Sequence, residues 1–575
     1  MDVIYNAGGE ALAAYLSDCE QRYSSEHKMI GRTWSSPGYH TQYPEGAWAH
    51  PTRDSMTYAL ALLRADRLQD SETACNVTLS PVESEVRATR AADVIRKVLT
   101  LQETKPTAAT YGIWPWVLEE PLSEMAPPDW NWADFIGALL AQMLAQHPTQ
   151  LPDDLLSAMR ASLGHAASAI FRRNVAPSYT NIAVLGGFVT AAAGELLEAS
   201  WLLDYGRQRL ADVVASAEYH GGFNEYNSPT YTLVVLHSCE RALQLLQDQS
   251  ARAHAEALRE LAWRTIAEHF HPPTAQWSGP HSRAYRDRLD PATHQILRLG
   301  AGLMEDDGSL LWLVDPLPCP PALAERFRVL PAPETEVVRA FIRRPEAWAS
   351  RTGTTWLADG AALGTVDYED FWTQRRPLIG YWRVPAEAPA VLRLRFLHDG
   401  RDFASACGQH AQADNRVLTG FGLLTNRGDW HLHLDRPDDG LFYVSDLRVR
   451  YELDAQDARV RQMSSDRFEM VAGDYRAVIH VFPGTFDGRP VSWTCGMVGG
   501  KAVVDGICYQ GDPVAFDPAA VTQINLGVAL ELLRPGEHEV DLGPVWHSAT
   551  DETLKLAWPA AGLRLTVPLY PHPSR

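Results

Sequence analysis

A short segment in the middle of the chain gathers side chains that can exchange protons. Residues 221–231 read Gly-Gly-Phe-Asn-Glu-Tyr-Asn-Ser-Pro-Thr-Tyr and precede the apolar run 232–236. Ser228 is a favourable helix N-cap, and Pro229 suits the first helical position because its missing N–H would be unpaired there. Tyr231 is therefore expected in the first turn of a helix, whose positive end favours the phenolate. A phenol in this place can take or return a proton, as an elimination reaction requires.

A second candidate, Asn181, opens the apolar run 182–188. The helix that follows is apolar nearly all round, which indicates an inner, fully packed helix. An asparagine here can cap the helix or offer its amide to a substrate carboxylate, and the sequence leaves both roles open. Glu225 and Asn227, just before the tyrosine, are also predicted to contact a substrate.

The third candidate cluster is residues 278–287, Ser-Gly-Pro-His-Ser-Arg-Ala-Tyr-Arg-Asp. Its Gly-Pro pair enforces a loop, which would present His281, Arg283 and Tyr285 together. An arginine in such a loop can clamp a carboxylate through two parallel hydrogen bonds. The alternative is a loop held by its own ion pairs.

Tryptophans are concentrated in the segments 111–116 and 127–132. Indole faces suit the apolar faces of sugar rings, so these segments are predicted to help bind a carbohydrate. Tryptophan also fills protein cores, and this second reading stays open. The predicted contacts are Trp116, Trp130, Asn131 and Trp132.

Histidines supply further candidates in the C-terminal half. His410 precedes an alternating strand and is the preferred candidate for a catalytic imidazole from that half. His431 and His433 would share one face of a strand and could form a metal site with Asp435. Because two histidines on a strand are more often solvent-facing or already bonded, we expect no metal and no other cofactor.

The pattern of apolar residues changes about halfway along the chain. Helical periodicity dominates up to residue 335, and short alternating runs typical of strands follow over 336–575. Prolines at 316–321 and 331–333 mark the boundary. The predicted helices include 56–67, 133–146, 155–172, 182–203, 233–249 and 251–269. The predicted strands include 337–342, 391–396, 418–424, 441–449, 477–482, 524–532 and 563–567.

The helical half also has an internal rhythm. Asn131, Asn181, Tyr231 and His281 follow one another at steps of 50 residues. A helical hairpin with its connections has about this length, which indicates stacked hairpins in a solenoid or a closed α/α toroid. In a toroid the inner helices run parallel, so their N-termini converge and residues 50 or 100 positions apart can meet.

Composition limits the classes of partner. A chain of 575 residues is too long for one ordinary core, so two or more domains are expected. Its 51 basic and 71 acidic residues give a net charge of −20, which argues against nucleic acid or an anionic membrane as partner. No apolar run approaches the roughly 20 residues that span a bilayer. Local arginines and helix N-termini can still bind a small anion.

The N-terminus and the cysteines indicate a cytoplasmic protein. Residues 1–6 lack a basic region followed by a long apolar one, so no secretory signal is expected. The seven cysteines form no CxxC pair and are odd in number, which predicts buried free thiols in a reducing compartment. Walker, dinucleotide-binding, G-x-S-x-G and HExxH motifs are missing. The sequence leaves a homo-oligomer open.

These patches resemble the heparinase II/III-like polysaccharide lyases and their alginate, chondroitin and glucuronan lyase relatives. The order of a helical and a β half matches over nearly the whole chain, and Asn181 and the Ser-Pro-x-Tyr segment 228–231 match the motifs. The resemblance implies an α+β multidomain protein: an N-terminal α/α toroid, as an incomplete barrel of helical hairpins, then a C-terminal antiparallel β-sandwich. Two departures are Ile182, where the family's Asn-His pair has histidine, and the interrupted His-Ala-Asp pattern at 410–414.

The resemblance implies β-elimination at a uronic acid within an oligosaccharide or polysaccharide. Asn181 and Arg283 would hold the carboxylate and stabilise the charge that develops as the proton on C5 leaves. Tyr231 would transfer protons, and His281 or His410 would share that work.

Three other functions stay open on the sequence. A glycoside hydrolase would use paired carboxylates such as Glu120 and Glu225 on either side of the bond. A uronate epimerase would share the proton abstraction without cleaving the chain. A non-catalytic carbohydrate-binding protein would need the tryptophans alone.

Overall fold

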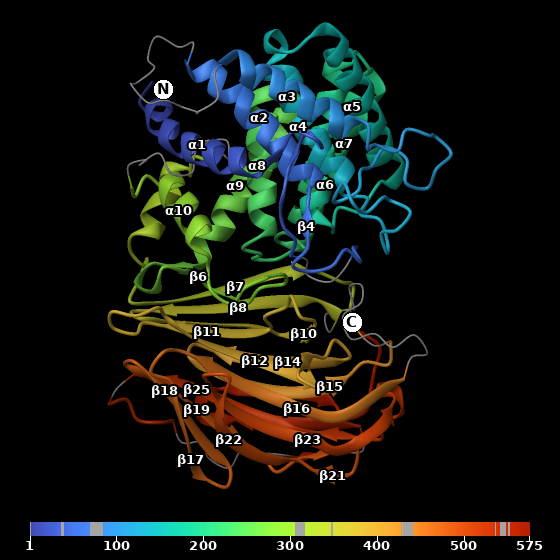
Figure 1. Ribbon diagram of the computed structural model, residues 1–575. Helices are drawn as coiled ribbons and strands as arrows, with labels where there is room; N and C mark the ends of the chain where they lie inside the picture. Colours follow the sequence, from blue (N-terminus) through green and yellow to red (C-terminus); the bar gives the residue numbers. More distant parts are fainter. Residues whose placement is uncertain are drawn as a thin grey trace. The chain divides into compact units, whose positions relative to one another are not determined.

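The chain divides into two compact units (Figure 1). Unit 1 comprises Met1–Glu218, Tyr231–Trp263 and Pro291–Pro321, and unit 2 comprises Tyr219–Thr230, Arg264–Asp290 and Ala322–Arg575. Two segments from the helical half, 219–230 and 264–290, thus group with the strands. The computed structural model describes residues 2–35, 40–69, 84–304, 317–346, 349–426, 428, 441–534, 536–540, 548–549 and 552–574.

Helices form nearly all of unit 1, coloured blue to green in Figure 1. Two short strand pairs, β1 (Tyr23–Ser24) with β2 (Met29–Ile30) and β3 (Arg32–Thr33) with β4 (Trp48–Ala49), connect the first two helices. The helices along the chain are α1 (Asp2–Arg22), α2 (Thr52–Gln69), α3 (Ser84–Leu99), α4 (Trp132–Gln146), α5 (Asp153–Arg173), α6 (Thr180–Leu196), α7 (Ser200–His220), α8 (Tyr231–Leu245), α9 (Gln249–His269), α10 (Pro291–Gly300) and α11 (Pro321–Ala324).

Helix α6 is an inner helix, as its apolar sequence predicts. Every residue from Thr180 to Gly194 is buried. The neighbouring α5 buries only the residues that recur every three or four positions, as an outer helix does. The predicted helix 182–203 is in fact two helices, because the chain turns between α6 and α7 at Glu198, whose φ is +55°.

Small residues let α6 and α7 approach closely. Gly187 of α6 faces Gly206 and Leu210 of α7, and Gly194 faces Leu203. These pairs run in opposite directions along the two helices, so the helices are antiparallel. A methyl group at Gly194 or Gly206 would meet backbone atoms, which makes these two contacts specific to glycine.

Three hydrogen-bond contacts show that α4, α6 and α8 run parallel. Glu195, at the end of α6, accepts from the backbone N–H groups of Gln247 and Asp248, just after the end of α8. Arg241 of α8 donates to Gln142 of α4, and both lie ten residues beyond the first residue of their helix. At the opposite end, Asn131 before α4 bonds to Tyr179 before α6. The N-termini of these inner helices therefore converge, as the 50-residue rhythm predicts.

Unit 2 is built mainly from two antiparallel sheets. The nine-stranded sheet has the order β22-β23-β16-β12-β11-β9-β8-β7, with β13 on β12, and the seven-stranded sheet has the order β10-β14-β15-β25-β19-β18-β17. The nine-stranded sheet contains β7 (Glu334–Ile342), β8 (Arg351–Ala358), β9 (Ala361–Val366), β11 (Leu378–Trp382), β12 (Ala390–His398), β13 (Arg401–Asp402), β16 (Phe442–Asp454), β22 (Ser492–Val498) and β23 (Lys501–Phe516). The seven-stranded sheet contains β10 (Tyr368–Asp370), β14 (Ala406–Ala413), β15 (Arg416–Leu423), β17 (Arg459–Ser464), β18 (Arg467–Ala472), β19 (Tyr475–Val481) and β25 (Gly527–Leu533).

One apolar core joins the two sheets into a sandwich. It takes Leu392 and Val449 from the nine-stranded sheet and Phe421 and Ile479 from the seven-stranded sheet, all fully buried or nearly so. A small sheet of β26 (Ser548–Ala549), β27 (Thr553–Trp558) and β28 (Leu563–Pro568) packs on the seven-stranded sheet through a second cluster. The remaining strands are β5 (Phe270–His271), β6 (Gln276–Trp277), β20 (Thr485–Phe486), β21 (Arg489–Pro490) and β24 (Ile524–Asn525). The predicted class, helical hairpins followed by an antiparallel β-sandwich, is confirmed.

Two further observations concern the described part of the chain. None of its helices is long and apolar enough to cross a membrane. Its six cysteines form no disulfide, and all except Cys495 are buried.

The close contact between α6 and α7 predicts opposite effects for two helix glycines. In Gly206→Ala the new Cβ would lie 2.4 Å from the backbone nitrogen of Ala191, so we expect a loss of about 1–3 kcal/mol of stability. In Gly164→Ala, on α5, the nearest atom is a Leu197 side-chain carbon 3.6 Å away, so better helix propensity should add up to about 1 kcal/mol. Thermal unfolding followed by circular dichroism measures both. Equal melting temperatures for the two variants would contradict this packing.

Candidate active site

Asn181 lies in the first turn of α6 and is fully buried. The residue at the N-cap position is Tyr179, which makes no side-chain cap. Asn181 is therefore not the helix cap, which was one of its two readings. Its amide lies at the end of α6 where the inner helices converge.

A chain of hydrogen bonds links the starts of α4 and α6. Asn131 occupies the N-cap position of α4, and its amide nitrogen donates to the Tyr179 hydroxyl at 3.1 Å. Arg173, at the end of α5, donates to the Asn131 amide oxygen at 2.6 Å. The guanidinium lies 5.9 Å from the centre of the Tyr179 ring. The substrate contact of Asn131 stays a prediction, and the structure shows that Asn131 holds the Arg173 cation at the convergent helix starts.

Asp134 lies in the first turn of α4 and is 2% exposed. Burial raises the pKa of its carboxyl group to about 7, although Arg173 and Arg209 act to lower it. Arg209 of α7 is itself buried and donates to the Ala183 carbonyl at 3.1 Å and to Asn174 at 3.2 Å. Two arginines thus accompany a carboxyl group that is largely neutral below neutral pH.

Tyr231 is the first residue of α8 and is half-buried. Its place in the first helical turn agrees with the prediction. Ser228 and Pro229 do not start the helix, however, and this part of the prediction is wrong. The Ser228 hydroxyl instead donates to the carbonyl of Arg283 at 2.7 Å, which commits it to a loop of unit 2.

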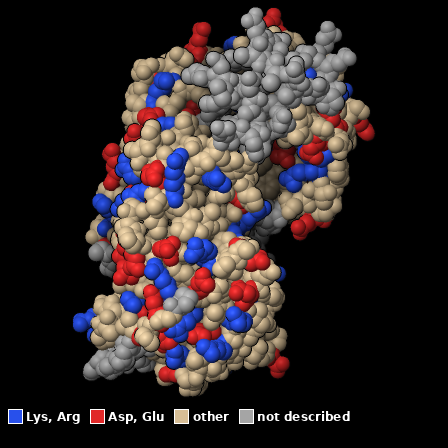
Figure 2. Space-filling view, turned by 90° about the vertical axis from the view of Figure 1, so that its left-hand side faces the viewer, with Lys and Arg blue, Asp and Glu red and all other residues tan. Residues whose placement is uncertain are grey.

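The convergent helix starts combine positive groups with the carboxyl groups of Asp129 and Asp134. Helix N-termini carry partial positive charge, and Arg173 adds a full one. Acidic residues outnumber basic ones to give −20, but both signs are mixed over the face shown in Figure 2. Attraction of an anion to this end of unit 1 is therefore a local effect.

The tryptophans form a small aromatic cluster. The rings of Trp116 and Trp132 stack with centroids 5.2 Å apart, and Trp34 meets Trp116 edge-on. Trp116 is buried, and its indole nitrogen donates to Asp129 at 3.1 Å. Core packing therefore explains this tryptophan without a role in carbohydrate binding. Trp130 and Trp132 are half-buried, and their indole nitrogens donate to Ala109 and Thr52, respectively.

Asn227 holds a loop of unit 2 together. It is fully buried and has a φ of +50°, in the left-handed region. Its amide nitrogen donates to the carbonyls of Ser278 and Pro280 at 2.8 Å each, and its amide oxygen accepts from Trp277 at 2.5 Å. Its polar atoms are thus used inside the protein, which gives Asn227 a structural role in place of the predicted substrate contact.

His281 is 2% exposed, and its orientation is fixed. Its Nδ1 lies 2.6 Å from the carbonyl oxygen of Asn227, so Nδ1 carries the hydrogen and Nε2 keeps its lone pair. Burial lowers its pKa to about 3, so the imidazole is neutral at ordinary pH. Nε2 is thus the ring nitrogen that could accept a proton, and the lowered pKa makes it a weak base.

Arg283 is held by three neighbours in unit 2. Its Nε and one Nη donate to the Gln374 oxygen at 3.1 and 3.0 Å, and its other Nη lies 3.4 Å from Glu225. The guanidinium also lies 5.2 Å from the ring centre of Trp372. Glu225 is therefore an ion-pair partner of Arg283. Tyr285, the third predicted residue of this loop, is 47% exposed.

The sequence did not single out the pair Tyr226 and His269. The tyrosine hydroxyl lies 2.7 Å from Nε2 of His269, and Nδ1 of that histidine lies 2.7 Å from the carbonyl oxygen of Thr265. Nδ1 therefore carries the hydrogen, and Tyr226 donates to Nε2. Burial raises the pKa of Tyr226 and lowers that of His269 to about 4, so both are neutral.

His410 precedes the predicted strand, which is β15, but it lies in the middle of a strand that the sequence did not predict, β14. It is 4% exposed, its Nδ1 lies 2.9 Å from the Thr419 hydroxyl, and its Nε2 is inaccessible to solvent. Burial lowers its pKa to about 3. These features are those of a core histidine, so the structure does not support the predicted catalytic role.

The remaining metal candidates lie outside the described residues. His431, His433 and Asp435 belong to that part of the chain. Among the residues that are described, no group of three or more His, Cys, Asp and Glu side chains could hold a metal ion.

The two units each bring together part of the predicted site. Unit 1 collects Asn131, Asn181 and Tyr231 at the starts of parallel helices, and unit 2 collects His281 and Arg283 in one loop. Tyr179 and Arg173 were missed. The tyrosine could have been found because it stands two residues before Asn181, whereas a basic residue ending an outer helix gives no signal of its own.

The raised pKa of Asp134 predicts a pH-dependent stability. Between its ordinary pKa of 3.8 and its folded value of about 7, the folded protein binds more protons than the unfolded chain. This contribution is present below about pH 4 and is lost as the pH rises through 7, by at most about 4 kcal/mol. Asp134→Asn should flatten the decline of melting temperature over this range. The exposed Asp154 on α5, changed to asparagine, serves as control, and equal slopes for Asp134→Asn and wild type would contradict the assignment.

Comparisons with known proteins give the following results. Residues 25–292 match a family model described as a domain of unknown function, DUF8769. No curated protein matches the sequence. The structure is similar to that of heparinase III, with 10% identity and a TM-score of 0.45 over 98% of this chain and 91% of that one. It is also similar to a mutant of the heparan sulfate lyase HepC from Pedobacter heparinus, with 10% identity and a TM-score of 0.32 over 90% of this chain and 95% of that one. The chain is thus similar to two heparinase-type lyases along most of its length.

Proposed function

We propose that this protein is a lyase that cleaves a uronate-containing glycan by β-elimination. The observation that carries the proposal is the convergence of α4, α6 and α8, which places Asn131, Asn181 and Tyr231 at the same end of unit 1. Amide donors, positive helix ends and Arg173 suit a carboxylate, and Tyr231 suits proton transfer. Of these groups, Asn181 and Tyr231 are the ones that the sequence resemblance implies for elimination at a uronic acid.

The reaction follows from these groups. Asn181 donates a hydrogen bond to the uronate carboxylate and stabilises the enolate-like charge as the C5 proton leaves. Tyr231 takes this proton or returns one to the glycosidic oxygen on C4, and serves both steps when the two atoms lie on one face of the sugar. The C4–O bond breaks, and the product carries a C4–C5 double bond conjugated with the carboxylate.

Unit 2 supplies the second set of proposed groups. His281 is the proposed partner in proton transfer, as the sequence resemblance implies, and its contact with the Asn227 carbonyl fixes which ring nitrogen is free to take part. Arg283 is proposed as an additional carboxylate clamp, with Gln374 and Glu225 holding its guanidinium in place. The proposed substrate is an oligosaccharide or polysaccharide that contains uronic acid.

The paired-carboxylate hydrolase is less well supported by the geometry. Glu120 is 3% exposed, and its two oxygens accept from the Thr41 hydroxyl at 2.5 Å and the Gln42 backbone at 2.7 Å. Glu225 is paired with Arg283. Carboxyl groups that already take part in these hydrogen bonds and this ion pair are poorly placed to protonate a glycosidic oxygen or activate water.

The elimination itself is tested with uronate oligosaccharides of several types and ultraviolet absorbance of the unsaturated product. Wild type should generate this absorbance together with new reducing ends. Tyr231→Phe removes only the hydroxyl and should lower kcat by about 10²–10⁴-fold, as expected for loss of an acid–base group. Tyr443→Phe, an exposed tyrosine on β16, is the matched control and should keep full activity.

Three results would contradict parts of the proposal. New reducing ends without the absorbance would establish hydrolysis. Inversion at C5 without chain cleavage would establish an epimerase. Full elimination activity in Tyr231→Phe would remove Tyr231 from the mechanism while leaving the lyase function intact.

Arg173 gives a separate prediction about substrate binding. Its charge is held at the helix starts by Asn131, whereas its neighbour Arg172 donates to the Pro106 carbonyl at 2.8 Å. Arg173→Gln should raise KM for an acidic oligosaccharide by about tenfold, equivalent to one charge-assisted hydrogen bond of about 1.4 kcal/mol. Arg172→Gln should change KM much less. Equal effects of both variants would show that general charge, and no specific contact, is responsible.

A further inference from the structure

The loop that carries His281 and Arg283 has no secondary structure of its own. It runs between β6, which ends at Trp277, and α10, which begins at Pro291. Its backbone conformation must therefore be fixed by contacts with other parts of unit 2. A proton-transferring group needs such fixation, because its reach to the proton is a matter of tenths of an ångström.

Four contacts attach this loop to the connection between β10 and β11. The backbone N–H of His281 donates to the carbonyl of Arg376 at 3.3 Å, and the backbone N–H of Arg376 donates to the carbonyl of His281 at 2.9 Å. Ala284 donates its backbone N–H to the Gln374 carbonyl at 2.7 Å, and the Gln374 side chain accepts from Arg283. The connection thus holds the backbone at His281, while the Asn227 carbonyl holds the imidazole ring.

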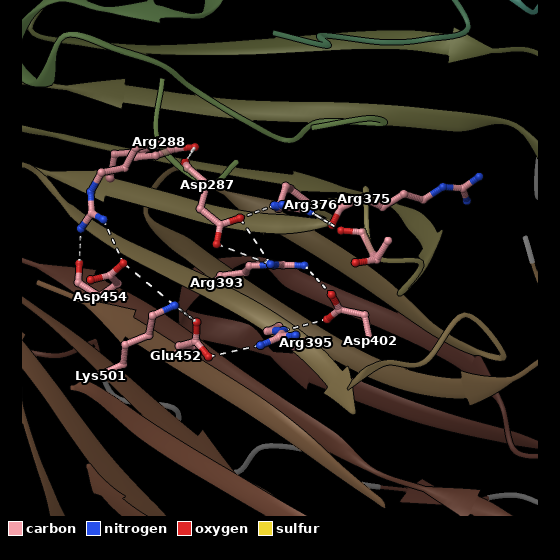
Figure 3. Close-up of polar contacts among 12 residues, drawn as sticks. Asp287, Arg288, Arg375, Arg376, Arg393, Arg395, Asp402, Glu452, Asp454 and Lys501 are labelled. Atoms are coloured by element: carbon pink, nitrogen blue, oxygen red, sulfur yellow. Dashed lines mark hydrogen bonds and ion pairs between the residues drawn. The ribbon is translucent and has the colours of Figure 1, made fainter. Parts of the chain in front are cut away.

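Two neighbouring side chains fasten the loop to the sheet (Figure 3): Arg288 donates to Asp454 of β16, and Asp287 bonds both to the sheet and to the connection. The Asp287 carboxylate accepts from Nε of Arg376 and lies 3.3 and 3.4 Å from an Nη of Arg393 on β12. Its backbone carbonyl accepts from the Tyr381 hydroxyl at 2.7 Å. One Nη of Arg376 donates to the carbonyls of Thr373 and Arg375, within the same connection.

The charges around Asp287 leave this carboxylate little freedom. Both arginines are buried, and they repel each other: burial and the nearby Arg393 lower the pKa of Arg376 to about 10. Burial alone would raise the pKa of Asp287, but Arg393 and Arg376 hold it well below its usual range. Without this carboxylate Arg376 would lose its ion-pair partner, and Arg393 would keep only its pairing with Asp402. Removal of Asp287 therefore leaves the buried Arg376 charge uncompensated and favours movement of the segment that carries it.

The sheet also holds a second buried carboxylate that bonds to Arg393, but within the described part of the chain this one is not bonded to the His281 loop or to Arg376. Asp402, on β13, accepts from Arg393 at 3.1 Å and from Arg395 at 2.7 Å (Figure 3). It is nearly fully buried and makes no bond to the His281 loop among the described residues. Loss of Asp402 therefore damages the ion network without releasing the loop.

We propose that Asp287 is a positioning residue that holds His281 in place for proton transfer, through Arg376. This inference rests on the proposed function for the role of His281. It assigns no contact between Asp287 and the substrate. The carboxylate acts only by fixing the loop and the connection to which the loop is bound.

The kinetic test compares Asp287→Asn with Asp402→Asn, both acting on a uronate oligosaccharide. Asp287→Asn should lower kcat by about 10²-fold, the size of effect caused by a misplacement of about 1 Å, while KM changes by less than about threefold. Asp402→Asn should keep kcat within about threefold of wild type. Asp287→Glu, which restores the charge, should recover part of the lost kcat. Equal losses of kcat in Asp287→Asn and Asp402→Asn would overturn the proposal.

A second readout is independent of activity. The imidazole resonances of histidine-labelled protein are followed against pH, and His281 is assigned by its loss in His281→Gln. In wild type its pKa should stay near 3, and in Asp287→Asn it should rise toward the ordinary 6.5 as the loop opens to water. It should remain near 3 in Asp402→Asn. An unchanged pKa in Asp287→Asn would overturn the positioning role, whereas absence of elimination in wild type would overturn only the proposed function.

Discussion

The close packing of α6 is the constraint on which unit 1 depends. Gly187, Gly194 and Gly206 let α6 and α7 approach until a methyl group added at Gly194 or Gly206 would meet backbone atoms. A helix buried on every side has no exposed face, so its chemistry is confined to its ends. Because α4 and α8 run parallel to α6, their ends coincide with its own. The position of Asn181 and Tyr231 at one end of unit 1 follows from this packing.

In unit 2 the candidate residues lie in irregular segments, so hydrogen bonds and ion pairs, in place of helix packing, must position them. The Asn227 amide nitrogen donates to two backbone carbonyls of the loop and its oxygen accepts from the Trp277 indole, while Asp287 ties the loop to the buried Arg376 and to Arg393 of the sheet. Buried polar groups must be paired, so each such bond also removes an alternative conformation. This rigidity depends on buried charges, and each of them is stable only while it keeps its ion-pair partner.

Much of the fold could be predicted from the sequence, because periodicity reports burial directly. The all-apolar pattern of α6 and the alternation of the strands were sufficient, whereas the break at Glu198 has no glycine or proline to mark it. Local motifs placed Tyr231 and Asn181 at helix starts. Asn227 and His410 could not be assigned in this way, because whether an amide or imidazole is exposed or already bonded depends on tertiary neighbours such as Trp277 and Thr419.

The most direct test of the account is a crystal structure of Tyr231→Phe with an acidic oligosaccharide bound. The central claim is that the convergent starts of α4, α6 and α8 receive the uronate carboxylate. The account predicts a carboxylate oxygen about 3 Å from the Asn181 amide nitrogen, with C5 of the same sugar facing the ring at position 231. A uronate bound with its carboxylate away from Asn181 and from these helix starts would contradict it.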